Sequence, residues 1–112
     1  MVLHRGDIVG INLNPKKGDE VGKIRPCIII SDDESNNILD TIIVVPLSTS
    51  LLDNMEPFRQ RLSKRDNLKY NSDILINHIR TISKKRVTSH ISKITQDEYK
   101  KIVKNICLML EN

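Results

Sequence analysis

The chain of 112 residues has no tryptophan and few other aromatic residues. Its rings are those of Phe58, Tyr70 and Tyr99, which make up 3% of the sequence. Proteins that bind single-stranded nucleic acid on stacked aromatic platforms need more rings than this. The composition therefore argues against that mode of binding.

Cysteine is equally scarce, and the common metal and catalytic motifs are missing. Cys27 and Cys107 each lie among aliphatic residues, outside any CxxC or Cys/His cluster. We predict two buried, reduced thiols, no metal site and no cofactor. The three histidines lack the spacing of metal ligands. GxSxG, Walker, GxGxxG and HExxH patterns do not occur either.

Long apolar runs are also missing, so the sequence predicts no membrane span, which takes roughly 18 apolar residues. The N-terminal MVLHRGD lacks the apolar core of a secretion signal, and we expect a cytoplasmic protein with one domain over residues 1–112. The net charge is +4, from 18 Lys+Arg and 14 Asp+Glu. This charge fits an ordinary soluble protein as well as one with a polyanionic partner.

Most of the apolar patterning is typical of strands. In DIVGINL, from Asp7, apolar residues alternate, which predicts a half-buried strand. The β-branched runs CIIIS (27–31) and TIIVVPLS (41–48) predict buried strands. Because proline cannot donate to a ladder, Pro46 indicates an edge or a bulge. ILINHIRTI (74–82), with apolar residues at both parities, predicts one long strand.

The segments between these runs are polar. NPKKGDEVGK (14–23) predicts a loop, and DDESNNILD (32–40) a turn-rich connector. In PFRQRLS, the alternation puts Phe58, Gln60 and Leu62 on one face and the two arginines on the other. SKKRVTSHISKI, from Ser83, predicts a basic turn followed by a short strand.

The C-terminal segment predicts a helix. Thr95 and Glu98 have the spacing of a capping box, and Ile94 and Tyr99 that of a hydrophobic staple. An apolar stripe at helical spacing is expected to face the core; its members are Tyr99, Ile102, Val103, Ile106 and Leu110. Together the elements predict a small, strongly bent antiparallel sheet or barrel with one helix packed against it.

Polar groups at strand ends are the candidates for chemistry. Arg25 precedes one buried strand and Ser48 ends the next. If the two strands are antiparallel neighbours, a guanidinium and a hydroxyl lie at the same end of the sheet, where they could bind a phosphate. The alternative is structural: Arg25 pairs with Asp19 or Glu20, and Ser48 caps a turn.

Several motifs, in order along the chain, resemble those of MazF/PemK/Kid-type toxins from toxin–antitoxin pairs. They are RGDIVGINLNP, GDEVGKIRPCIIISDD, TIIVVPLST and HIRTISKKRV, followed by the terminal helix. The resemblance runs from Arg5 to about Leu110. The arginine–proline pair and the IRTI run are its most specific parts.

The resemblance implies a mainly β fold with short helices, namely an SH3-like barrel of the CcdB/MazF type closed by a C-terminal amphipathic helix. It also implies a homodimer that cuts single-stranded RNA such as mRNA at short sequences without a metal. The partner would be an antitoxin, a small acidic protein with a disordered tail that occupies the RNA groove. The active-site arginine of the family falls on Arg25, its strand-end hydroxyl on Ser48 and its loop glutamate on Glu20.

The chemistry that fits is attack of the ribose 2′-OH on the adjacent phosphate, which gives a 2′,3′-cyclic phosphate. Arg25 would stabilise charge on the phosphate oxygens and Ser48 would donate one hydrogen bond. The proton acceptor stays open, because arginine remains protonated. Histidine suits acid–base work, but the family commonly has glutamine at the position of His78, which we expect to be structural or to read a base.

RNA contacts are expected from the loop at 14–24 and from residues near the strand ends. The candidates are Lys16, Lys17, Glu20, Lys23, Thr49, Asn77, His78 and Arg80. Lys84, Lys85 and Arg86 are expected to form a solvated turn. Departures from the family pattern at Val21, Asn77 and His78 leave the cleavage sequence and the level of activity open.

Two other functions remain possible on this fold. One is a CcdB-like toxin that inhibits DNA gyrase through the end of the terminal helix. The other is a module that binds RNA or an antitoxin without cutting. Growth arrest with DNA damage that persists in an Arg25→Ala variant would favour the first. Tight RNA binding with no cleavage product would favour the second.

Overall fold

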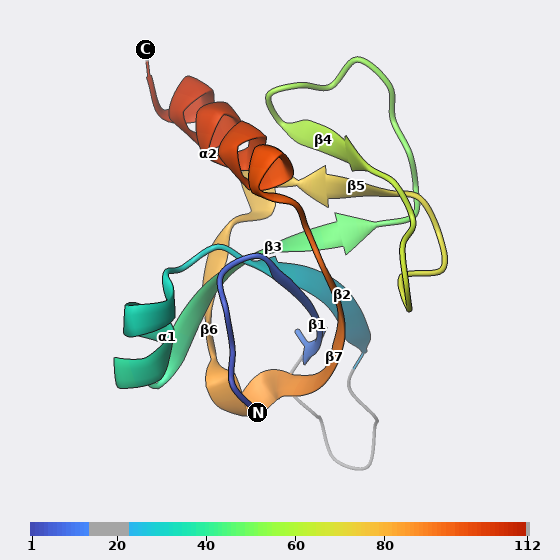
Figure 1. Cartoon of the computed structure of the whole chain (residues 1–112). Helices are drawn as coiled ribbons and strands as arrows, with labels where there is room; N and C mark the ends of the chain where they lie inside the picture. Colours follow the sequence, from blue (N-terminus) through green and yellow to red (C-terminus); the bar gives the residue numbers. More distant parts are fainter. Residues whose placement is uncertain (14–22, 112) are drawn as a thin grey trace.

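The computed structural model describes residues 1–13 and 23–111. These residues form a strongly bent antiparallel sheet, two α-helices and two 3-10 turns (Figure 1). The strands are β1 (Asp7–Asn12), β2 (Ile24–Ile29), β3 (Thr41–Ser48), β4 (Arg59–Leu62), β5 (Ser72–Leu75), β6 (Arg80–Ser83) and β7 (Val87–Lys93). The helices are α1 (Asp33–Ile38) and α2 (Gln96–Leu110), and the 3-10 turns are η1 (Ile76–His78) and η2 (Lys84–Arg86).

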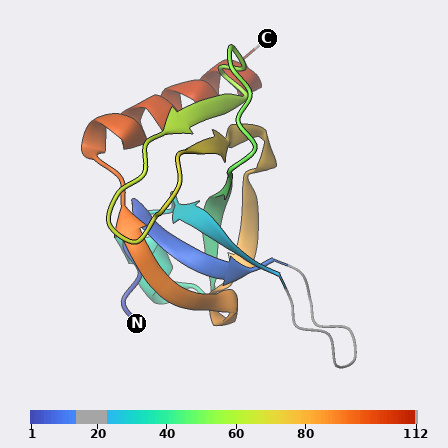
Figure 2. The ribbon, with the colours of Figure 1, turned by 90° about the vertical axis from the view of Figure 1, so that its right-hand side faces the viewer.

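The sheet has the order β4-β5-β3-β2-β1-β7, and β6 pairs with β3. Within the described residues β4 and β7 do not pair, so the sheet bends like a barrel without closing. Figures 1 and 2 place α2 beside β4 and β5, with the two chain ends on opposite sides of the molecule. The mainly β fold with a C-terminal helix is confirmed, whereas the barrel is looser than expected. None of the helices in the described part of the chain is long and apolar enough to span a membrane.

Two apolar clusters cover the two faces of the central strands. Alternate residues of β1 divide between them, because Ile8 packs in one cluster while Val9 and Ile11 pack in the other. The expected strand at Asp7 is therefore confirmed, but it is buried on both faces. Cys27 is fully buried in the second cluster, as predicted.

The segment 74–82 is not one strand, contrary to the prediction. β5 and β6 both pair with β3, where Leu47 is opposite Ile74 and Val44 is opposite Arg80. Between these two pairs β3 has two residues, whereas the segment that joins Ile74 to Arg80 has five. This segment therefore contains three extra residues. The number of extra residues equals the length of η1, and η1 bulges out of the ladder opposite the part of β3 that contains Pro46. Pro46 lacks the N–H that a ladder bond would need, and its predicted irregularity is confirmed.

Residues 33–38 form a helix where a turn-rich connector was expected. Asp32 caps it by accepting a hydrogen bond from the Ser35 N–H, at 3.0 Å. The helix is fixed to the sheet by Asn36, which is buried and donates to the Ser31 carbonyl at 2.9 Å. The short strand expected near the C-terminus is β7, with seven residues.

The α2 helix begins with the predicted capping box. The Glu98 N–H donates to the Thr95 hydroxyl at 3.1 Å, and the Thr95 N–H donates to the Glu98 carboxylate at 2.8 Å. Ile102 is fully buried. Three expectations for this helix are wrong, because Val103, Cys107 and Leu110 are exposed. The core-facing stripe is therefore narrower than the apolar pattern suggested.

Candidate functional site

The strand β2 begins earlier than expected and includes Arg25. It pairs with β3 through Cys27 opposite Pro46. This is the last pair of the β2–β3 ladder, and Arg25 and Ser48 each lie two residues beyond it, at the same end of the two strands. The antiparallel arrangement that the sequence argument required is therefore present.

Arg25 lies in a cavity of about 390 Å³ at the rim of the bent sheet. The cavity is lined by Leu13, Arg25, Pro46, Leu75, Asn77, His78 and Arg80. Three of the predicted RNA-contact residues, Asn77, His78 and Arg80, thus line the same cavity as Arg25. The turn η1 produces this arrangement, because its three extra residues push Asn77 and His78 out of the ladder.

The two arginines of this cavity have no acceptor within the described residues. The chain has seven arginines, of which three form ion pairs, Arg59 and Arg61 with Asp73, and Arg65 with Glu98. Arg5 lies 4.8 Å from the Tyr99 ring centroid, and Arg86 donates to the Leu13 carbonyl. Arg25 and Arg80 therefore present free guanidiniums, which favour an anionic ligand.

A buried thiol lies close enough to these two cations for their charge to act on it. Burial raises the pKa of the Cys27 thiol to about 12, against the opposing effect of the Arg80 and Arg25 guanidiniums. The thiol donates weakly to the Arg25 carbonyl at 3.8 Å. Cys27 is therefore a neutral packing group, and it supplies no nucleophile to the cavity.

Ser48 and Thr49 do not line the cavity. Ser48 is half-buried at the end of β3, and Thr49 is exposed beyond it. The Ser48 hydroxyl accepts a hydrogen bond from the Ser50 N–H at 3.1 Å, as the structural alternative of a capped turn expects. Accepting this bond leaves the hydroxyl hydrogen free to donate.

A buried carboxylate next to Ser48 was not predicted. Asp73 lies opposite Ser48 in the β3–β5 ladder, and its side chain is 1% exposed. Burial acts to raise its pKa, but the Leu52 N–H and the guanidiniums of Arg61 and Arg59 outweigh this, and the pKa of Asp73 is lowered. The signal in the sequence was the charged residue directly before the apolar run at 74–76.

The remaining predicted contacts lie in or beside the loop. Lys16, Lys17 and Glu20, like Val21, are outside the described residues, and the same holds for the suggested pairing of Arg25 with Asp19 or Glu20. Lys23 is exposed, directly before β2.

The basic run at 84–86 forms η2 and is partly structural. Lys84 donates to the Asn36 carbonyl at 2.8 Å, and Arg86 donates to the Leu13 carbonyl at 3.0 Å. Lys85 is exposed.

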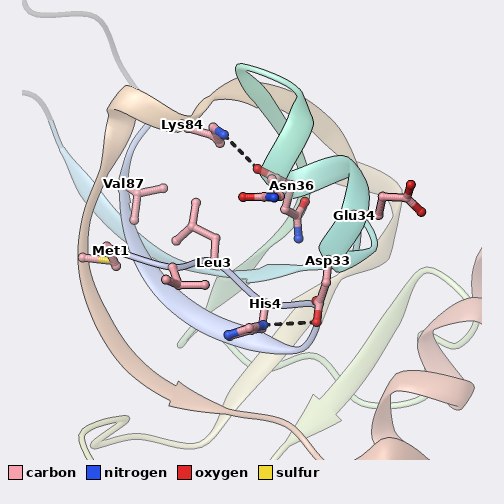
Figure 3. Close-up of a pocket in the computed structure, with 10 residues that line it drawn as sticks. Met1, Leu3, His4, Asp33, Glu34, Asn36, Lys84 and Val87 are labelled. Carbon is pink, nitrogen blue, oxygen red and sulfur yellow. Dashed lines mark hydrogen bonds and ion pairs between the residues drawn. The ribbon is translucent and has the colours of Figure 1, made fainter.

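A larger cavity, of about 670 Å³, lies elsewhere, between the N-terminal residues and α1 (Figure 3). Two of its polar side chains are already bonded: Lys84 to the Asn36 carbonyl, and His4 to Asp33 at 3.1 Å. Leu3 and Val87 make part of its wall apolar. The smaller cavity around Arg25 is therefore the better site for an anion. The described residues contain no group of three or more His, Cys, Asp or Glu side chains that could hold a metal ion.

Solved structures with the same fold support this description. The chain superposes on MazF from Deinococcus radiodurans with a TM-score of 0.77 and 19% identity, covering 100% of this chain and 99% of that one. A MazE–MazF structure from the same organism gives a TM-score of 0.78 and 19% identity, with coverage of 98% and 97%.

Sequence comparison identifies the family. Residues 4–110 match the family model described as PemK-like, MazF-like toxin of type II toxin–antitoxin system. The endoribonuclease EndoA of Bacillus subtilis (strain 168) is 31% identical over 103 residues, which are 91% of this chain and 89% of that protein. Both matches extend over β2, η1 and β6, the elements that carry the cavity. The chain therefore belongs to the PemK-like, MazF-like toxins of type II toxin–antitoxin systems.

Proposed function

We propose that this toxin is a metal-independent endoribonuclease that cuts single-stranded RNA in the cytoplasm, with Arg25 and Ser48 as its catalytic residues. The observation that carries the proposal is the pair of guanidiniums, of Arg25 and Arg80, that share one cavity without an acceptor among the described residues. Elsewhere in the described chain, arginines are held by carboxylates, a ring or a carbonyl. The name of the Bacillus subtilis relative supports the same activity.

The reaction needs an oriented substrate and a place for developing charge. The ribose 2′-OH attacks the adjacent phosphorus, the bond to the 5′ oxygen of the next nucleotide breaks, and a 2′,3′-cyclic phosphate remains. The proton of the 2′-OH goes to a base that we leave unassigned, and the leaving oxygen gains a proton. Arg25 neutralises charge on the phosphate oxygens and the Ser48 hydroxyl donates to one of them.

The other cavity residues suit contacts with the RNA around the reacting phosphate. Arg80 provides a second guanidinium for a neighbouring phosphate. Asn77 and His78 are exposed on η1, and their amide and imidazole groups can hydrogen-bond to base edges of an unstacked strand. Lys23, directly before β2, and Thr49, directly after β3, would extend these contacts from the two strand ends. Lys16, Lys17 and Glu20 would extend them from the loop.

Two protein partners belong to the same proposal. The first is an antitoxin, a small acidic protein whose disordered tail occupies the cationic cavity in place of RNA. The MazE–MazF structure from Deinococcus radiodurans supports such a pairing. The second is another copy of the chain, since exposed apolar residues on α1 and β3 provide a surface for a homodimer.

The test is incubation of the purified protein with mixed-sequence single-stranded RNA in EDTA. We expect cuts at one short sequence, with 2′,3′-cyclic phosphate ends, and an Arg25→Ala variant that is slower by at least about 100-fold. Arg5→Ala is the matched control, because it removes an arginine from a different hollow, and it should cut as the wild type does. RNA that stays intact, or equal cutting by Arg25→Ala, refutes the proposal.

A further inference from the structure

The buried carboxylate of Asp73 stands in line with Ser48 across the sheet. Asp73 is opposite Ser48 in the β3–β5 ladder and opposite Arg61 in the β5–β4 ladder. Residues directly opposite each other in antiparallel strands point to the same face. A charge that is 1% exposed is therefore placed one strand away from the proposed catalytic hydroxyl. Buried charges persist where other groups pair with them.

The backbone that follows Ser48 is held by this carboxylate. The Leu52 N–H donates to the Asp73 Oδ2 at 2.8 Å. Arg59 Nη1 donates to the same oxygen at 3.2 Å and to the Ser50 carbonyl at 2.9 Å. The Ser50 N–H in turn donates to the Ser48 Oγ at 3.1 Å. A continuous chain of contacts thus runs from the carboxylate through Arg59 and Ser50 to the hydroxyl.

The turn depends on these contacts because little else holds it. Residues 49–52 are all exposed, and Leu51 and Leu52 are 41% and 49% exposed. A turn without buried side chains keeps one conformation only when its hydrogen bonds fix it.

We propose that Asp73 and Arg59 are positioning residues, which hold the 48–52 turn so that the Ser48 hydroxyl donates its hydrogen toward the scissile phosphate. This inference rests on the proposed ribonuclease function. Because the Ser48 oxygen accepts a hydrogen bond from the Ser50 N–H, the hydroxyl still has one hydrogen to donate. The same bond restricts the directions in which that hydrogen can point. A donor misplaced by 1 Å can cost about 100-fold in rate, so fixing the turn has a measurable effect on catalysis.

The experiment compares Arg59→Met with Arg61→Met. Both variants remove an ion pair with Asp73, at 3.2 Å for Arg59 and 2.7 Å for Arg61. Arg61→Met also removes the pair with Asp53, which follows the turn, but only Arg59 contacts residues 48–52. We expect Arg59→Met to lower kcat by about 10-fold or more while KM changes by less than about 2-fold. Arg61→Met should stay within about 3-fold of the wild type. Equal losses of kcat in the two variants overturn the inference.

A double-mutant cycle with Ser48→Ala tests whether Arg59 acts through the hydroxyl. If it does, Arg59→Met causes no further loss of kcat once Ser48 has been replaced by alanine. Losses that add fully show that Arg59 acts elsewhere, and they overturn the inference.

Amide hydrogen exchange, followed by NMR without RNA, separates this inference from the proposed function. In Arg59→Met we expect the Ser50 and Leu52 amides to exchange at least about 10-fold faster than in the wild type, whereas Arg61→Met keeps the wild-type rates. Unchanged exchange in Arg59→Met overturns the positioning role. A wild-type protein that leaves RNA intact refutes the nuclease instead, and the exchange rates still report whether Arg59 holds the turn.

Discussion

At the scale of single residues, the charge on Asp73 links the stability of the fold to pH. Unfolded aspartates titrate near about pH 4, whereas the Leu52 N–H, Arg61 and Arg59 lower the pKa of Asp73 in the folded protein against the effect of burial. A carboxyl with a lowered pKa stabilises the fold above its unfolded pKa, and this stability is lost as the pH falls through the folded pKa.

We therefore expect the free energy of unfolding, measured in urea from pH 7 to pH 3, to decrease below about pH 4. Asp73→Asn should lose on the order of 2 kcal/mol at pH 7 and show a flatter decrease in acid. Asp53→Asn is the control, because it removes a carboxylate that also binds Arg61 but is 82% exposed. Equal acid profiles for Asp73→Asn and the wild type would refute this link.

Cys27 allows a second test at this scale. Its thiol is fully buried, and burial raises its pKa to about 12. In a Cys107→Ala background, which leaves one thiol, we expect Cys27 to react with a disulfide reagent at pH 8 at least about 100-fold more slowly than in guanidinium chloride. Rapid reaction in the native protein would show that the apolar cluster around Cys27 opens readily to the reagent.

The sequence indicated part of the site and missed the rest for a physical reason. Arg25 was conspicuous because a charged residue stands directly before a buried run, whereas Arg80 was one of several polar groups within the expected strand at 74–82. The role of Asp73 depends on pairing between β3, β4 and β5, which are separated by the irregular segments 49–58 and 63–71. Local patterns do not report such pairing, so the ion pairs with Arg59 and Arg61 emerged only from the structure.

At the scale of elements, strands with clear apolar runs were predicted well, and β3 matches its prediction at both ends. The failures are short elements whose signal is weak. The three residues of η1 lie inside an apolar run, so their sequence resembles a strand. The α1 helix is six residues long, and its polar sequence resembles a turn unless the Asp32 cap is recognised. In PFRQRLS, Gln60 and Leu62 are both buried, in agreement with the shared face that the alternation predicted, but Phe58 is 48% exposed.

The capping box of α2 gives a prediction about an element. Because the Thr95 hydroxyl accepts from the Glu98 N–H, Thr95→Ala should lower the free energy of unfolding by about 1 kcal/mol in urea denaturation. Thr95→Ser keeps the hydroxyl and should stay close to the wild type. Thr95 is exposed, so lost packing does not explain a difference between the two variants. Equal stability of both variants would show that the cap contributes nothing.

At the scale of the whole molecule, the described arginines include some that pair with carboxylates and others that have no acceptor within the described part of the chain. Asp73 of β5 forms ion pairs with Arg59 and Arg61 of β4. Glu98 of α2 forms an ion pair with Arg65, which follows β4. The arginines without acceptors among the described residues gather at the rim near η1. The fold thus uses some arginines for its own stability and leaves Arg25 and Arg80 available to a polyanion.

One group of exposed apolar residues lies at α1 and β3, and it leads to a prediction about assembly. Leu39 and Ile43 line one hollow between α1 and β3, and Ile38 beside them is 70% exposed. If this surface forms the proposed homodimer, Ile43→Lys places a charge in the interface and shifts the protein to monomers, because an unpaired buried charge is costly.

Sedimentation equilibrium should then give a dimer for the wild type and a dissociation constant at least about 100-fold weaker for Ile43→Lys. Met55→Lys is the matched control, since Met55 is 37% exposed and Ile43 is 39% exposed, and Met55 lies away from this hollow. A wild-type monomer would refute the homodimer. A dimer that both variants leave intact would place its interface on another part of the surface.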